Sequence, residues 1–156
     1  MTIKHTLIIL ALGASVIVSC KKKDEPAPAA PVVVATGSGT FKVNNTTQTP
    51  TVFTRKVYTA AGVTFTQVTA QNDKYNIKME FTNATLSSGN YTITQTFLEG
   101  NMNVAITLSD LIGNKVYLSD EEAIIKVKVD GKKITLPTIT IDNNPVTTIS
   151  ADITLP

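Results

Sequence analysis

The sequence predicts an all-β domain that folds as an antiparallel β-sandwich of about eight to ten short strands. Apolar and polar residues alternate with a period of two, most regularly over 75–81, 102–108 and 149–155, which makes one side of each segment apolar. Asparagine, aspartate and glycine interrupt these segments at short intervals and supply turns. An up-and-down β-barrel is the alternative, because many of the connections are short enough for hairpins.

The expected strands follow one another from residue 40 to the end of the sequence. Threonine is abundant in them, and its branched β-carbon suits a pleated surface. No segment has the i, i+3, i+4 spacing of a long amphipathic helix, although 109–112 could form one helical turn. We expect strands over 40–44, 52–59, 63–71, 74–81, 90–98, 102–108, 115–119, 123–129, 132–141 and 146–155.

One hairpin is predicted in detail, with Asp130-Gly131 as its two-residue turn. This register pairs Lys128 with Lys133 across the two strands. Its core face consists of four aliphatic residues, Ile125, Val127, Ile134 and Leu136. Pro137 cannot donate a ladder hydrogen bond, so we expect an edge or a β-bulge at that point.

The first nineteen residues have the composition of a signal peptide. Lys4 and His5 precede an apolar run over 7–18, which is shorter than the roughly twenty residues that span a bilayer. Ser19, a small residue, comes directly before Cys20, the only cysteine of the chain. We therefore expect cleavage after Ser19.

The segment Ile17-Val18-Ser19-Cys20 resembles the lipobox of bacterial lipoproteins. The resemblance implies a diacylglycerol on the thiol of Cys20 and an acyl chain on its amine, and two or more chains make membrane anchoring stable. An ordinary cleaved signal peptide with a cysteine nearby by chance is the alternative. The segment Lys21-Lys22-Lys23-Asp24-Glu25 is similar to the export signal of surface-displayed lipoproteins in some Gram-negative bacteria, or it is a solvated charge run.

These resemblances imply a Gram-negative outer-membrane lipoprotein on the cell surface or the periplasmic face. Residues 20–39 form the expected tether. Pro26, Pro28 and Pro31 favour an extended chain of about 3.1 Å per residue, so the stretch 24–39 could reach on the order of 50 Å. Residues 40–156 form one β domain of ordinary size.

The predicted domain has no net charge. Four of the 14 basic residues and two of the 12 acidic residues precede position 40, which leaves ten of each sign. A nucleic-acid partner is therefore not expected, because a basic field that would displace counterions is missing. The expected partners are the membrane, through the lipid, and an envelope protein or glycan.

The side chains of the predicted domain argue against an enzyme. His5, the only histidine, leaves with the signal peptide, so residues 40–156 contain neither histidine nor cysteine. This excludes Ser-His-Asp and Cys-His nucleophilic sites and the common zinc sites. The sequence also has no tryptophan and no glycine-rich phosphate loop. We expect no cofactor.

Carboxylates are the remaining candidates for chemistry. Asp120, Glu121 and Glu122, with Asp110 nearby in the sequence, could ligate calcium, because hard cations prefer oxygen ligands. The alternative is a solvated acidic turn between two strands. A carboxylate-based hydrolase would need two convergent acidic groups, one of them buried.

A group of lysines on the predicted hairpin is the candidate binding surface. Lys126, Lys128 and Lys133 are expected on its outer face, with Lys132 near the turn. They could contact an anionic ligand such as an acidic glycan or lipopolysaccharide, or they could keep the sheet from aggregating.

The sequence thus predicts a lipid-anchored envelope protein that acts as a non-catalytic binding, adhesion or structural module. A small-ligand carrier with a barrel cavity is the alternative, and a carboxylate hydrolase is the third hypothesis.

Overall fold

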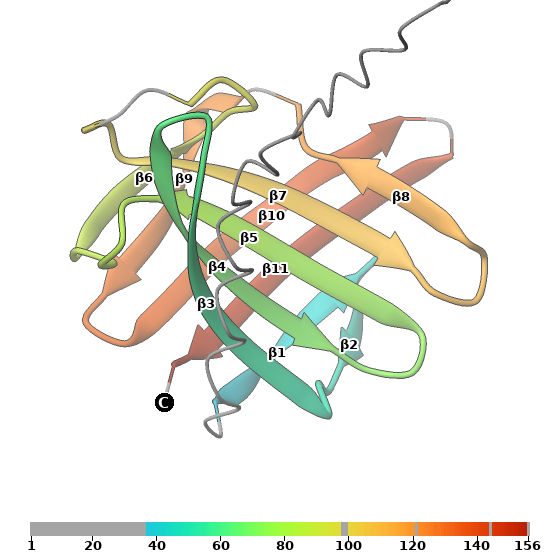
Figure 1. Cartoon of the computed structure of the whole chain (residues 1–156). Helices are drawn as coiled ribbons and strands as arrows, with labels where there is room; N and C mark the ends of the chain where they lie inside the picture. The colour runs from blue at the N-terminus through green and yellow to red at the C-terminus, as the bar shows by residue number, and fades with distance from the viewer. Residues whose placement is uncertain (1–36, 98–99, 121, 144, 156) are drawn as a thin grey trace, which may run out of the picture.

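The computed structural model describes residues 37–97, 100–120, 122–143 and 145–155, and these residues form eleven β-strands without a helix. The predicted all-β class is therefore confirmed. Figure 1 labels the strands: β1 (Ser38–Val43), β2 (Thr46–Gln48), β3 (Val52–Ala60), β4 (Val63–Gln71), β5 (Tyr75–Thr82), β6 (Gly89–Ile93), β7 (Asn103–Asp110), β8 (Lys115–Leu118), β9 (Glu122–Asp130), β10 (Lys133–Asn143) and β11 (Val146–Thr154).

The strands form one strongly curled sheet, a half-barrel, and the predicted two-sheet sandwich is wrong. Hydrogen bonds join the strands in the order β2-β1-β11-β10-β9-β6-β7-β5-β4-β3, and β8 pairs with β7 off this path. The link between the two halves is β6, which pairs antiparallel with β9 and parallel with β7 through Thr92 and Ile93. This order is not the sequential order of an up-and-down barrel either.

Most strands begin and end close to where the alternation and the turn residues predict. Each of the ten expected strands has a counterpart, although the one expected over 90–98 ends at Ile93. The short strand β2 was not expected. It forms a hairpin with β1 through Asn44 and Asn45, which both take the positive φ that suits this turn, at 50° and 61°.

The β9–β10 hairpin differs from its predicted register. Asp130 pairs with Lys133 and Val129 with Ile134, so the two turn residues are Gly131 and Lys132. Gly131 has a φ of 59°, as the first residue of such a turn requires. The observed register places opposite charges face to face, whereas the predicted one paired two lysines. The two registers differ by two residues, and side chains alternate with a period of two, so the same side chains face the core in both.

Pro137 lies in a β-bulge, as its missing N–H donor predicted. The pairing of β10 with β11 shifts between Leu136 and Ile139, and both of these side chains are buried. Pro137 and Thr138, which lie between them, are both exposed. The bulge therefore directs two consecutive side chains to the outer face of the sheet.

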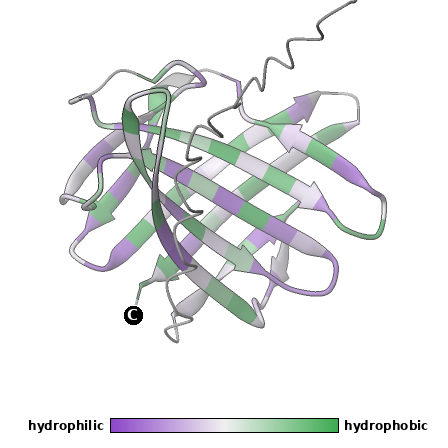
Figure 2. Cartoon of the chain, in the orientation of Figure 1, coloured by the Kyte–Doolittle hydropathy of each residue, from purple (hydrophilic) through white to green (hydrophobic). Residues whose placement is uncertain are grey.

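The concave side of the curled sheet holds the core, and apolar and polar residues alternate along the strands in Figure 2. At its centre Phe81 and Tyr91 meet edge to face, with ring centroids 5.0 Å apart. The Tyr91 hydroxyl is satisfied by the backbone of Ser87, to whose carbonyl it donates and from whose N–H it accepts, each at 3.1 Å. The edge strand β2 also contacts the turn that follows β4, because Asn72 donates to Gln48 at 3.1 Å.

Candidate functional site

The predicted anchor lies outside the described residues. This holds for Ser19, Cys20 and the charged segment 21–25. Within the part of the chain that the structure describes, no helix has the length and apolar character that a membrane span requires.

The predicted lysine surface lies on the outer face of β9 and β10, but three of its members have local partners. Lys126 donates to the Thr92 hydroxyl of β6 at 2.9 Å. Lys128 lies 3.8 Å from a carboxylate oxygen of Asp130, and both side chains are largely exposed. Lys133 forms an ion pair with Asp152 at 3.2 Å, and Lys132 is an exposed residue of the turn. One hydrogen bond and two exposed ion pairs thus engage three of the four lysines, and such exposed ion pairs contribute little to stability.

The acidic residues do not gather in the described structure. Asp110 accepts the backbone N–H groups of Ile112 and Gly113 at 3.1 and 2.8 Å, so its carboxylate organises the β7–β8 turn where one helical turn was expected. Asp120 is exposed, Glu121 lies outside the described residues, and the side chain of Glu122 is not described. Among the described residues no three histidine, cysteine, aspartate or glutamate side chains come together as metal ligands would.

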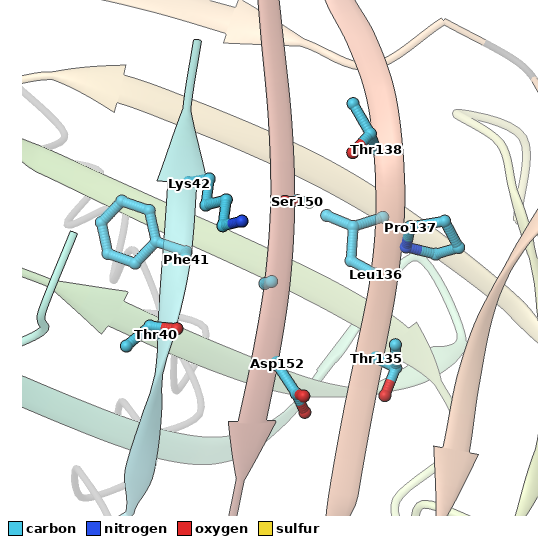
Figure 3. Close-up of a pocket in the computed structure, with 10 residues that line it drawn as sticks. Thr40, Phe41, Lys42, Thr135, Leu136, Pro137, Thr138, Ser150 and Asp152 are labelled. Atoms are coloured by element: carbon cyan, nitrogen blue, oxygen red, sulfur yellow. The ribbon is translucent and has the colours of Figure 1, made fainter. Parts of the chain in front are cut away.

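The structure instead places a hollow of about 370 Å³ on the outer face of β1, β11 and β10. The lining residues that point outward form two rows across the three strands, as Figure 3 shows. The first row consists of Thr40, Asp152 and Thr135, which are direct cross-strand partners. In the second row Lys42 pairs with Ser150, and the bulge lies on the far side of Ser150.

The hollow owes its shape to the bulge and to the small residues of the middle strand. Ser150 and Ala151 of β11 leave a low floor, while Lys42 and Pro137 rise on either side of it. The three other lining residues, Phe41, Leu136 and Ala151, belong to the core cluster, so they contribute chiefly backbone to this face. A regular strand would place only one residue opposite Ser150, and the wall of the hollow would be lower.

The polar side chains of the hollow differ in their ion-pair partners. Asp152 forms an ion pair with Lys133 at 3.2 Å, and both side chains are more than half exposed. Lys42 has no ion-pair partner among the residues that the structure describes. The hydroxyl groups of Thr40, Thr135, Thr138 and Ser150 can each donate and accept a hydrogen bond. The hollow therefore offers both kinds of hydrogen-bonding group over a short span.

A second polar cluster lies on the outer face of β3, β4 and β5. Tyr58 donates to one carboxylate oxygen of Glu80 at 2.5 Å, and Lys78 binds the other at 3.1 Å. The Tyr58 ring stacks on Phe65 with centroids 5.3 Å apart, and the Lys56 ammonium lies 5.4 Å from its centroid. The ring and the hydroxyl of Tyr58 are thus both engaged by neighbouring side chains, which indicates a stabilising cluster more than a ligand platform.

Burial raises the pKa of Tyr58 above its ordinary value of 10.0, and the hydrogen bond and the negative charge of Glu80 raise it further. The pKa of Tyr91 is also raised by burial, and its hydrogen bond with Ser87 acts in the opposite direction. Both phenols therefore stay neutral well above neutral pH and serve as hydrogen-bonding groups.

The sequence did not single out the hollow. Thr40 and Lys42 alternate on one strand and Ser150 and Asp152 on another, so their common outer face was predictable. What was missing was the pairing of the first strand of the domain with the last one, which the alternation does not encode. Pro137 was the one local signal, because it marked the bulge. No family model, curated protein or solved structure matches this chain.

Proposed function

We propose that this protein is a lipid-anchored, non-catalytic binding module of the Gram-negative cell envelope, and that the hollow over β11 binds an envelope glycan. Anchoring is supported by the lipobox-like sequence that ends at Cys20. The observation that supports binding is the hollow itself, with its rows of hydroxyl, ammonium and carboxylate groups.

The composition of the hollow suits a ligand that is rich in hydroxyl groups. Serine and threonine hydroxyls exchange hydrogen bonds with sugar hydroxyls in either direction, Lys42 donates, and Asp152 accepts. The Pro137 ring adds an apolar surface on one wall. A volume of about 370 Å³ falls in the range of roughly 300–1,000 Å³ that is typical of small-ligand sites.

The packing of the concave side favours this proposal over a carrier with a barrel cavity. Large side chains from both halves of the sheet meet there, and Phe41, Ile77, Phe81 and Ile106 are fully buried. A carrier would need an internal cavity lined by such residues instead of contacts among them.

The positions of three described carboxylates, those of Glu80, Asp110 and Asp152, favour binding over hydrolysis. Glu80 is bound to Tyr58 and Lys78, Asp110 is bound within its own turn, and Asp152 is paired with Lys133. These groups lie on separate strands or turns, whereas glycoside hydrolysis needs two carboxylates that converge on one bond.

The test uses the full lipidated chain, purified in nanodiscs, and a panel of soluble envelope glycans. The panel consists of lipopolysaccharide core and O-polysaccharide chains and the glycan strands of peptidoglycan. We expect at least one of them to bind, and Ser150→Tyr, which fills the hollow, to weaken that binding by about tenfold or more, or roughly 1.4 kcal/mol.

Thr154→Tyr is the matched control, because Thr154 is an exposed outer-face residue of the same strand that does not line the hollow. It should leave the affinity unchanged. The proposed site is wrong if no glycan of the panel binds, or if Ser150→Tyr binds the glycan as tightly as the Thr154→Tyr control and the parent protein do.

A further inference from the structure

The β7–β8 hairpin concentrates exposed apolar side chains. Eight large apolar residues of the described chain are exposed, and four of them lie between positions 111 and 118. They are Leu111, Ile112, Val116 and Leu118, with exposed fractions of 44%, 74%, 66% and 55%. Single exposed apolar residues are ordinary on protein surfaces, whereas a cluster of four on one hairpin indicates a contact surface.

The turn of this hairpin is held in shape by the backbone around it. The carboxylate of Asp110 accepts two backbone N–H groups within the turn. The Leu111 N–H donates to the carbonyl of Lys74 in the neighbouring β4–β5 turn at 2.8 Å. Leu111 and Ile112 are therefore presented at the end of β7 by hydrogen bonds that do not depend on their own side chains. Figure 1 shows the turn that joins β7 to β8.

The residues around this tip are those found where a protein meets lipid headgroups. Lys74 and Lys115 flank the turn, and Lys115 pairs with Asp110 across the hairpin. Tyr75 and Tyr117 lie half-buried one or two residues farther in, and the Lys74 ammonium lies 5.0 Å from the Tyr75 ring centroid. Apolar residues at a tip, with tyrosine and lysine behind them, match the order of layers in a bilayer surface.

We infer that the tip of the β7–β8 hairpin inserts Leu111 and Ile112 into the outer part of the bilayer to which the protein is anchored. This inference rests on the proposed lipid anchor. Sixteen residues separate Cys20 from Gly37, where the described structure begins, and such a segment reaches about 50 Å when extended. A tether of that length permits many orientations, so the side chains of the domain select the surface that faces the lipid.

The chain contains no tryptophan, so Ile112→Trp creates a single reporter at the tip. Ile124→Trp is the matched control, because Ile124 is 91% exposed and lies far from the tip. Ile124 lies on β9, where the nearby Glu122 pairs with Ile93 of β6. Ile93 in turn pairs with Val104 at the start of β7, and the length of β7 separates Val104 from the β7–β8 turn by about 20 Å.

Both full-length variants are purified with their lipid and reconstituted in vesicles of phosphatidylethanolamine and phosphatidylglycerol that contain brominated lipid. Flotation of the vesicles reports the anchor, and quenching of tryptophan by bromine reports insertion. We expect both variants to float, Trp emission at position 112 to shift to the blue and to be quenched several-fold, and emission at position 124 to remain unquenched.

Flotation without quenching at position 112 would overturn the insertion and leave the anchor intact. A blue shift without quenching would place the tip against protein, either a second copy or another partner, and would also overturn it. Failure to float would contradict the proposed anchor and, with it, the insertion.

Discussion

Tyr58 and Glu80 show how an outer sheet face can be stabilised by a polar contact. The Tyr58 hydroxyl and the Lys78 ammonium bind the two oxygens of one carboxylate, and Phe65 covers the phenol ring from one side. The partners of Tyr58 could not be found from the sequence, because Phe65 lies on β4 and Glu80 on β5. The register of β3 and β4 places Tyr58 opposite Phe65, and the alternation alone does not encode this register.

The raised pKa of Tyr58 predicts a loss of stability in alkali. Tyrosine in the unfolded chain ionises near pH 10.0, whereas folded Tyr58 keeps its proton at higher pH. The free energy of unfolding should therefore be level below about pH 9, fall above pH 10 and continue to fall up to the pKa of the folded state.

Urea unfolding at pH 8, 10 and 11 measures this loss. Tyr58→Phe should reduce the fall between pH 10 and pH 11. Glu80→Gln should reduce it in part, because burial still raises the pKa. An unchanged fall in Tyr58→Phe would show that Tyr58 ionises at the same pH in both states.

At the scale of the elements, the sequence predicted where strands begin and end better than how they pair. Alternation and turn residues located ten strands, because both are local properties. The register of the β9–β10 hairpin was shifted, since Asp130-Gly131 and Gly131-Lys132 are both acceptable turns by composition. The choice between them depends on which residues lie opposite each other, and the observed register places Asp130 opposite Lys133 where the predicted one placed Lys128 opposite Lys133.

The β-bulge in β10 can be tested by two neighbouring substitutions. Simple alternation from the buried Leu136 would point Thr138 inward and Ile139 outward, whereas the bulge reverses both. Ile139→Ala should therefore lower the free energy of unfolding by about 2–5 kcal/mol, because it removes buried methyl groups and leaves a cavity. Thr138→Ala should change it by about 0.5 kcal/mol or less. Equal effects of the two substitutions in chemical denaturation would contradict the bulge.

At the scale of the whole molecule, a sandwich and a curled sheet follow from the same alternating pattern of apolar and polar residues. A sandwich and a half-barrel both have one apolar and one polar side per strand, so alternation cannot separate them. The difference lies in β6, whose five residues join the two halves into one sheet. For the same reason the lysines of a single hairpin were predicted as a binding surface, whereas the hollow, which needs three strands, was not.

The proposed anchor predicts a change in the location of the whole protein. Cys20→Ala should abolish incorporation of labelled palmitate and release the protein from the membrane fraction, because it removes the thiol that we propose as the acceptor of the lipid. Ser15→Ala, a substitution within the apolar run of the expected signal peptide, should leave both properties unchanged. Retention of Cys20→Ala in the membrane fraction at the level of the parent protein would refute lipid anchoring through this residue.

The central claim is that the ligand sits on the outer face over β11 and not inside the curled sheet. The most direct measurement is methyl NMR of the lipidated protein in nanodiscs, labelled at threonine and isoleucine and titrated with a glycan that binds. We expect the methyl signals of Thr40, Thr135 and Thr138 to shift with the bound fraction, while those of the buried Ile77 and Ile106 stay in place. Shifts that occur at Ile77 and Ile106 and leave the three threonines unchanged would contradict it.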